Sequence, residues 1–94
     1  MTVRDPEFHD HFWINPFAKS FNHLTPDDLV LVNDQGVVVG GNMHCVNPAG
    51  YYIHSAIHRA RLDVHAVVHM HTIAGKAFSA FGKELEMWNQ DCCQ

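Results

Sequence analysis

One stretch of this 94-residue sequence reads DVHAVVHMH, from Asp63 to His71. Its run of apolar residues predicts a strand from Val64 to Met70, and a helix-like segment follows directly. Side chains alternate between the two faces of a strand, so residues two positions apart lie about 6.6 Å from each other on one face. We therefore expect His69 and His71 to point the same way, where both imidazoles could bind one cation.

The His-x-His pair predicts zinc as a cofactor but does not complete a zinc site. Imidazole is the commonest metal-binding side chain and suits zinc. A catalytic zinc ion usually has three protein ligands and a water molecule. His69 and His71 are the predicted metal ligands, and a third ligand must come from elsewhere. The alternative is that both histidines end a buried strand and hydrogen-bond to neighbouring loops without metal.

The composition predicts one small globular domain over residues 1–94. Hydrophobic residues make up 47% of the chain and charged residues 17%, a balance typical of folded rather than disordered proteins. The net charge is −4 and the six basic residues are scattered, which argues against nucleic-acid and membrane partners. The chain contains neither an apolar signal core nor a run of about 20 apolar residues. A cytoplasmic location and reduced thiols for the three cysteines are the expectations.

The sequence before residue 47 predicts mainly β-structure. Leu29–Val32 and Val37–Val39 are rich in β-branched residues and flank the turn sequence NDQG, so they are expected to form an antiparallel hairpin. A further strand is expected at His11–Asn15, with Phe12 and Ile14 on one side. Thr25–Asp28 has the capping sequence of a helical turn.

Two helices are predicted around the His-x-His stretch. Asn47 can cap the first, and His54 and His58 lie four residues apart on it, a spacing that can bind zinc. Both fall on the polar side, so we expect them to be solvated. The expected buried face consists of Ala49, Ile53, Ala56, Ile57 and Ala60. The second helix is expected from His71 to Phe81, and the order of elements indicates mixed α/β layers around a central sheet.

Several longer segments occur in an order and spacing that resemble a known family. They are HFWINPF (11–17), LTPDDLVLVN (24–33), NPAG (47–50), IHSAIHRAR (53–61), HAVVHMH (65–71) and GKAFS (75–79). Together they resemble the class II aldolase/adducin N-terminal domain family, particularly its fungal branch. The resemblance covers most of the chain, from Thr2 to Asp91.

The resemblance implies a three-layer α/β/α fold with a mostly antiparallel central sheet, usually assembled as a homo-oligomer. It also implies that His69 and His71 are two of the zinc ligands. In the aldolase members the metal polarises a carbonyl group while a carbon–carbon bond is made or cleaved. The implied activity is that of a metal-dependent aldehyde-lyase, or an epimerase, acting on a small hydroxy-carbonyl substrate.

The sequence departs from the family pattern in three ways. Gly50 stands where the family has its glutamate base, so no catalytic residue is assigned. Pro48 and Ala49 replace the serines that hold substrate phosphate, and no histidine follows His71 to serve as the family's third ligand. Family domains are longer, so the chain is expected to be a partial domain, truncated at both ends. Such a piece should expose strand edges and apolar surface unless a partner covers them.

These departures leave two functions open. The first is the zinc-dependent lyase, incomplete in this short chain, with His44, His54 and His58 as the only internal sources of a third ligand. The second is a non-catalytic, adducin-like assembly module associated with the actin cytoskeleton, although the chain has no basic tail for such contacts. A cupin-type site is rejected because no glutamate follows the pair before Glu84.

Overall fold

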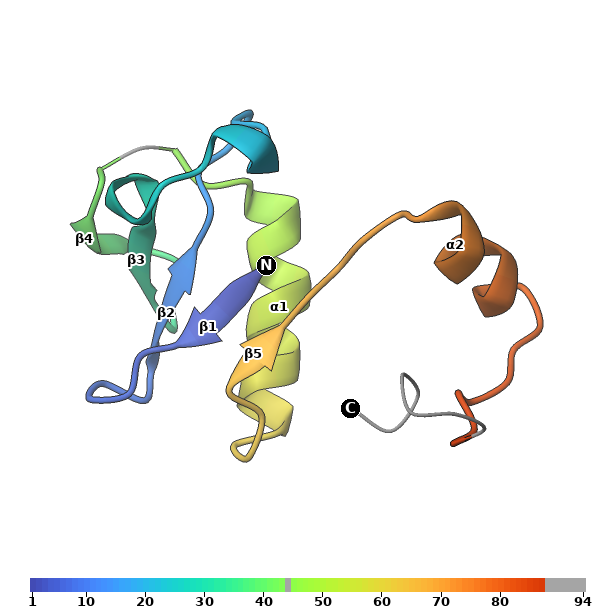
Figure 1. Ribbon diagram of the computed structural model, residues 1–94. Helices are drawn as coiled ribbons and strands as arrows, with labels where there is room; N and C mark the ends of the chain where they lie inside the picture. Colours follow the sequence, from blue (N-terminus) through green and yellow to red (C-terminus); the bar gives the residue numbers. More distant parts are fainter. Residues whose placement is uncertain (44, 88–94) are drawn as a thin grey trace.

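A computed structural model describes residues 1–43 and 45–87, in which five antiparallel strands form one sheet with a long helix against one face (Figure 1). The strand order is β4-β3-β2-β1-β5. The strands are β1 (Thr2–Arg4), β2 (His11–Ile14), β3 (Val30–Asn33), β4 (Val38–Gly41) and β5 (Ala66–Val67). The helices are α1 (Pro48–Ala60) and α2 (Ile73–Ser79), with 3-10 turns η1 (Phe21–His23) and η2 (Pro26–Asp28).

The predicted hairpin is confirmed as β3 and β4. The side chain of Asn33 accepts hydrogen bonds from the amides of Gln35 (3.0 Å) and Val37 (2.9 Å), and Gly36 has the positive φ of 83° that this turn requires. β4 continues through Gly41, two residues beyond the predicted end. The capping sequence at Thr25 also forms as predicted, because the Asp28 side chain accepts from the Thr25 amide at 2.8 Å.

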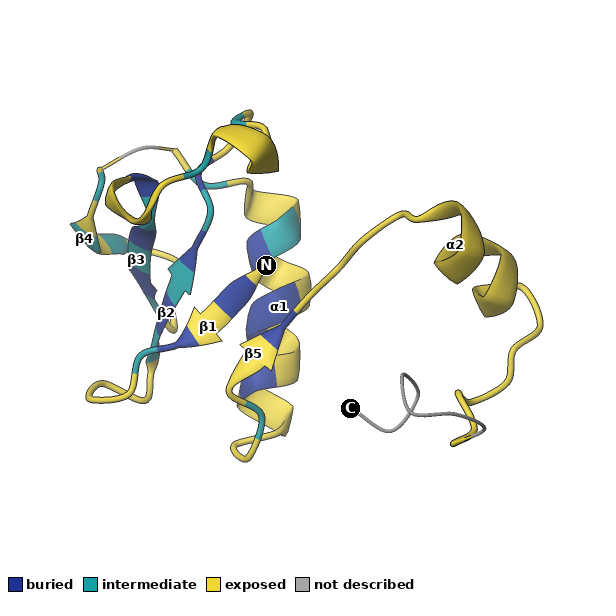
Figure 2. Cartoon of the chain, viewed as in Figure 1, coloured by how far each residue is buried: buried dark blue, intermediate teal, exposed yellow. Residues whose placement is uncertain are grey.

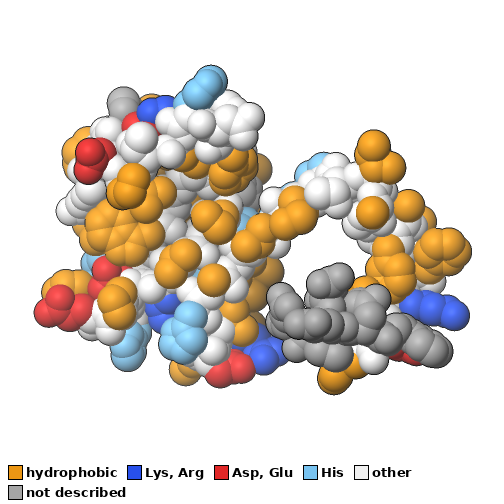
Figure 3. Space-filling view, in the orientation of Figure 1, with side chains coloured by type: hydrophobic (Ala, Val, Ile, Leu, Met, Phe, Trp, Pro, Cys, Tyr) orange, Lys and Arg blue, Asp and Glu red, His pale blue; other side chains and the backbone are white. Residues whose placement is uncertain are grey.

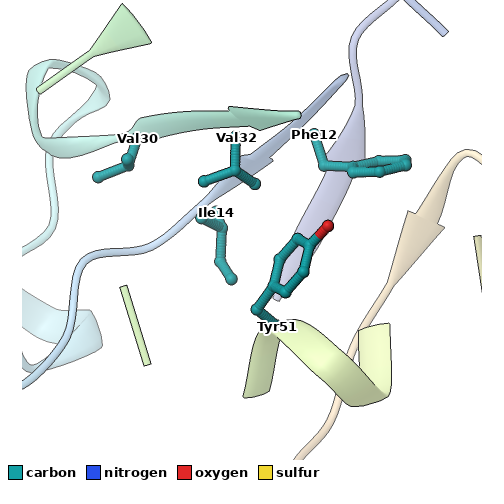
Figure 4. Packing of buried hydrophobic residues seen from close by; sticks show 5 residues of the cluster. All are labelled: Phe12, Ile14, Val30, Val32 and Tyr51. Atoms are coloured by element: carbon teal, nitrogen blue, oxygen red, sulfur yellow. The ribbon is translucent and has the colours of Figure 1, made fainter. Parts of the chain in front are cut away.

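The hydrophobic core lies between the sheet and α1 (Figure 4). Phe12 and Ile14 are 3% and 5% exposed, which confirms that they share the inner side of β2. Val30 and Val32 of β3 and Tyr51 of α1 complete the cluster. Burying each of these side chains contributes about 1.5 to 3 kcal/mol. The Tyr51 hydroxyl also donates to the Asn33 carbonyl oxygen (2.9 Å), which fixes α1 against the β3–β4 turn.

The prediction of which face of α1 is buried is wrong. His54 and His58 are buried, at 3% and 0% exposure, whereas Ile53 and Ile57 are 50% and 39% exposed (Figure 2). The apolar stripe follows helical spacing, but the opposite face docks because β1 supplies buried Thr2 as a hydrogen-bond partner for the histidines. A satisfied polar contact removes the cost of burying an imidazole.

Strand β1 was not predicted from the sequence, yet it lies between β2 and β5 and joins β5 to the rest of the sheet. It pairs antiparallel with β2, Thr2 facing Ile14, and with β5, Thr2 facing Val67. Its inward residues are polar and its central Val3 is 42% exposed, so its hydrophobic pattern is the reverse of that of a core strand. This arrangement brings the His-x-His stretch beside the N-terminal segment.

The region after β5 is less regular than expected. The strand predicted from Val64 to Met70 is reduced to Ala66–Val67. α2 begins at Ile73, capped by Thr72, whose hydroxyl oxygen accepts from the Gly75 amide (3.1 Å). The helix stands apart from the sheet (Figure 1) and has no buried residue. The described residues therefore form two layers, the sheet and α1.

Apolar surface is exposed, as the sequence predicted for a partial domain. Hydrophobic side chains lie open both over the sheet and around α2 (Figure 3). Over the sheet, Met1, Val3, Trp13, Leu24 and Leu29 line an apolar groove on the side away from α1. Near α2, Ile73 is 91% exposed. None of the described helices is long and apolar enough to cross a membrane.

The single cysteine within the described residues, Cys45, is a free and exposed thiol. Cys92 and Cys93 lie outside the described residues.

Candidate functional site

The Thr2 hydroxyl lies between two imidazoles of α1. Its Oγ1 is 2.9 Å from Nδ1 of His54 and 2.9 Å from Nε2 of His58. The His58 ring also stacks on Phe12, with ring centroids 4.6 Å apart. These contacts attach α1 to β1 and β2, so the two histidines are part of the folded interior.

Arg4 forms the second attachment between β1 and α1. Its guanidinium donates to the carbonyl oxygens of His58 and His9, both at 2.7 Å, and lies within 3.3 Å of those of Arg61 and Val64. A cation is favoured there because the last carbonyls of a helix carry partial negative charge. Arg4 therefore neutralises the C-terminal end of α1.

The hydrogen bonds favour one tautomer for each buried histidine. Nδ1 of His58 lies 3.3 Å from the Val64 carbonyl oxygen, which can only accept. Arg4 is 3.4 Å from the same nitrogen but has a better acceptor in the His58 carbonyl. With the proton on Nδ1, the bare Nε2 of His58 accepts from the Thr2 hydroxyl. Because a hydroxyl has one hydrogen, Thr2 must in turn accept from Nδ1 of His54.

This relay leaves Nε2 of His54 with a free lone pair. The atom has no hydrogen-bond partner among the described residues, and no fully enclosed side-chain nitrogen or oxygen there is unpaired. Nε2 must therefore reach the adjacent pocket of about 180 Å³, which we call the His54 pocket. The pocket is lined by Met1, Ile14, Asn15, Phe21, Asn47, Gly50, His54 and His69.

The structure places the two predicted metal ligands side by side. The ring centroids of His69 and His71 are 4.8 Å apart, close to the separation of about 5 Å for two imidazoles that share one tetrahedral zinc ion. Both side chains are exposed, and His69 lines the His54 pocket while His71 is not among its lining residues. The two rings are therefore neighbours, and metal binding by the pair stays a prediction.

Among the described residues, no third metal ligand joins the pair. Within residues 1–43 and 45–87, no three His, Cys, Asp or Glu side chains gather as a metal site requires. Of the internal candidates, His58 has both ring nitrogens engaged, and His44 lies outside the described residues. His54 is the candidate that shares a pocket with His69.

Gly50 leaves the pocket open. It lies one helical turn before His54 on the same face of α1. A Cβ atom at position 50 would meet nothing nearer than the Asn47 side chain at 3.9 Å. Pro48 has no amide proton, and the Ala49 amide already donates to Oδ1 of Asn47 (3.1 Å). The start of α1 thus offers few free hydrogen-bond donors to a phosphate group.

The buried imidazoles predict that stability falls below neutral pH. Burial lowers the pKa of both His54 and His58, so the unfolded chain, with histidine pKa values of about 6.5, binds more protons. The free energy of unfolding should therefore be highest above pH 6.5 and decrease as the pH falls below it. Urea unfolding between pH 8 and pH 5 measures this dependence.

The pH dependence of the free energy of unfolding should come from the buried histidines. Replacing buried His58 by glutamine should flatten the profile, whereas replacing exposed His23 by glutamine should leave it unchanged. Equal profiles for the wild type and His58→Gln would contradict the assignment.

The sequence matches one family over its whole length. The family is described as Class II Aldolase and Adducin N-terminal domain, and the match spans residues 1–94. The chain belongs to this family. Class II aldolases generally depend on zinc, although the described residues show no complete metal-binding group.

Relatives from both branches of the class II aldolase and adducin family are similar to the chain. The meiotically up-regulated gene 14 protein of Schizosaccharomyces pombe is 47% identical over 99% of this chain and 36% of its own length. Rat alpha-adducin is 44% identical over 85% of this chain and 11% of its own. The structure of L-fuculose 1-phosphate aldolase from Glaciozyma antarctica PI12 superposes with a TM-score of 0.84 and 53% identity, over 98% of this chain and 38% of that one.

The chain spans about a third of the length of the first curated relatives it matches. Sequence reasoning found the histidine pair and Gly50 but missed Thr2 and Arg4. The available signal was the alternation of Thr2, Val3 and Arg4, which fits a short strand with polar residues on one face.

Proposed function

We propose that this chain forms part of the metal and substrate site of a class II aldolase-type lyase, with zinc held by His69 and His71. The observation that carries the proposal is the pairing of the two rings at 4.8 Å, with His69 on the wall of the His54 pocket. Bound zinc would act as a Lewis acid on a substrate carbonyl. The substrate class is a small hydroxy-carbonyl compound.

The chain's own residues provide the walls of this site and lack a carboxylate base. Gly50 occupies the position of the family's glutamate, and the described residues do not complete the metal coordination. We infer that the full centre needs further ligands and a third layer of structure, supplied by additional chain or by a second copy in a cytoplasmic homo-oligomer. The exposed apolar surfaces over the sheet and around α2 support such an assembly.

Zinc analysis tests the proposal. We expect zinc to bind the purified chain and to be reduced to a trace in both His69→Ala and His71→Ala, because each removes one of two neighbouring ligands. Elemental analysis of dialysed protein measures the metal, and circular dichroism checks that the secondary structure is kept. His65→Ala, a change in the same stretch, is the matched control and should keep its zinc. Unchanged zinc in both pair variants would refute the assignment.

A second candidate is an adducin-like, non-catalytic assembly module that binds an actin-associated partner. The exposed apolar face of α1, with Ile53 half exposed, and the absence of a base at Gly50 favour it. The mass of the same sample in solution separates the candidates. A metal-free oligomer supports assembly, and a zinc-loaded protein supports the lyase.

A further inference from the structure

We propose that the outward face of α1 is a contact surface for a second copy of this chain, which packs its own α1 antiparallel to the first across a twofold axis. We call this face the α1 stripe, and it consists of Ala49, Tyr52, Ile53, Ala56, Ile57 and Ala60. The inference rests on the proposed function only for the presence of a second copy, and it deepens that proposal by naming the contact face. Its test needs no metal, so zinc binding and self-association can fail separately.

The α1 stripe is apolar although it faces water. All six of its residues are exposed, and Tyr52 is 68% exposed (Figure 2). A surface helix normally turns its apolar side chains to the core and its polar side chains to solvent. Here the buried face carries the polar residues His54, Ser55 and His58, so the apolar residues are left outside. Apolar side chains gathered on one exposed face are typical of an interaction site.

Two arginines border the C-terminal end of the α1 stripe, and both have partners within the chain. Nε of Arg59 donates to the Ser55 carbonyl oxygen at 3.3 Å, and Nη2 donates to the Ser55 hydroxyl oxygen at 3.0 Å. Arg61 pairs with Asp63 at 2.7 Å. A second helix can therefore exclude water from the stripe without separating either guanidinium from its partner, which avoids the cost of burying an unpaired charge.

The spacing of the α1 stripe makes it complementary to a second copy of itself. Ala49, Ile53, Ala56 and Ala60 follow one another at intervals of four, three and four residues, which is the 3.5-residue period of a helix pair. In one antiparallel register, Ala49 of each copy faces Ala60 of the other, and Ile53 faces Ala56. Each bulky isoleucine then lies against a small alanine, so the two helices can approach to about 8 Å.

The charges favour the antiparallel over the parallel arrangement. Arg59 and Arg61 both lie at the C-terminal end of α1, so a parallel pair would bring like charges together. An antiparallel pair keeps them at opposite ends and sets the partly positive start of one helix beside the partly negative end of the other. A helix of 13 residues is only about 20 Å long, which gives a contact at the low end of specific interfaces. The dimer should therefore be reversible.

Sedimentation equilibrium of the full chain, freed of metal with EDTA, tests the proposal. We expect a monomer–dimer equilibrium that shifts with protein concentration. Ile53→Lys should raise the dissociation constant by about a hundredfold, because each of the two copies would bury an ammonium group without a partner. Val3→Lys is the matched control, since Val3 is similarly exposed but lies on the sheet, and it should dimerise as the wild type does. Circular dichroism checks that both variants keep their secondary structure.

Cysteine cross-linking tests the antiparallel register. In a chain whose three cysteines are replaced by serine, Ala49→Cys and Ala60→Cys should cross-link with each other when the two variants are mixed, through a short thiol-reactive reagent. Neither variant should cross-link with itself, because equal positions lie about 16 Å apart along the antiparallel pair. A parallel pair would give the reverse pattern and would overturn the proposed arrangement.

Three further results would overturn the inference. They are a chain that stays monomeric up to about 1 mM, equal dissociation constants for the wild type and Ile53→Lys, and a larger effect of Val3→Lys than of Ile53→Lys. Dimerisation through the α1 stripe by a chain that takes up no zinc would support this contact and refute the metal assignment. Zinc uptake by a chain that stays monomeric would do the reverse.

Discussion

Replacing Arg4 by alanine is expected to lower the free energy of unfolding by about 3 kcal/mol or more, because each buried group left without a partner costs about 1 to 3 kcal/mol. The guanidinium is 7% exposed and serves four backbone carbonyl oxygens, those of His9, His58, Arg61 and Val64. The free energy of unfolding of a small domain is only about 5 to 15 kcal/mol, so a loss of this size removes a large part of it. Urea unfolding followed by circular dichroism measures the loss.

A matched arginine provides the control. Arg61 pairs with Asp63 at 2.7 Å, but both side chains are more than 60% exposed, so Arg61→Ala should cost about 1 kcal/mol or less. Arg4→Lys keeps the positive charge but loses the fork of donors, and should fall between the two. Equal losses for Arg4→Ala and Arg61→Ala would show that the buried guanidinium does not anchor α1.

Gly41→Ala is expected to be the most damaging of the glycine substitutions in the sheet, with a loss of about 3 kcal/mol. Gly41 has a positive φ of 68°, which costs an L-residue about 1 to 2 kcal/mol. A Cβ there would also overlap the Leu29 carbonyl oxygen and press on the Trp13 ring at 3.0 Å. Because the obstacle at Leu29 is backbone, the end of β4 would have to separate from β3. Thermal and urea unfolding measure the change.

The same substitution in α1 should act in the opposite direction. Gly50 has ordinary helical space around it, with nothing nearer than 3.9 Å, so Gly50→Ala should raise stability by up to about 1 kcal/mol. A stabilising Gly41→Ala would mean that the β3–β4 edge can open without cost.

The two anchors of α1 are connected through His58. Arg4 and Thr2 lie on one short strand, and both hydrogen-bond with His58. His58 in turn sets the proton position on Thr2 and, through it, the lone pair of His54.

Local chemistry in the sequence was enough to predict several elements. The β-branched runs around Asn33–Gly36, the alternation of Phe12 and Ile14, the caps at Thr25 and Asn47, and the adjacency of His69 and His71 all appear in the structure. Each depends on residues within a few positions of one another. Backbone geometry fixes such patterns before any distant contact is made.

Only the tertiary structure decided which face of α1 is buried and how the pocket forms. Helical spacing correctly identified an apolar stripe, but the partners of the other face, Thr2 and Arg4, lie 52 to 56 residues away in sequence. Hydrogen bonds over such distances favour burial of His54 and His58 against their polarity, because each of these bonds offsets part of the cost of burying an imidazole. The sequence alone therefore determined the family and the position of the histidine pair, and long-range pairing with β1 decided that His54 and His58 are buried.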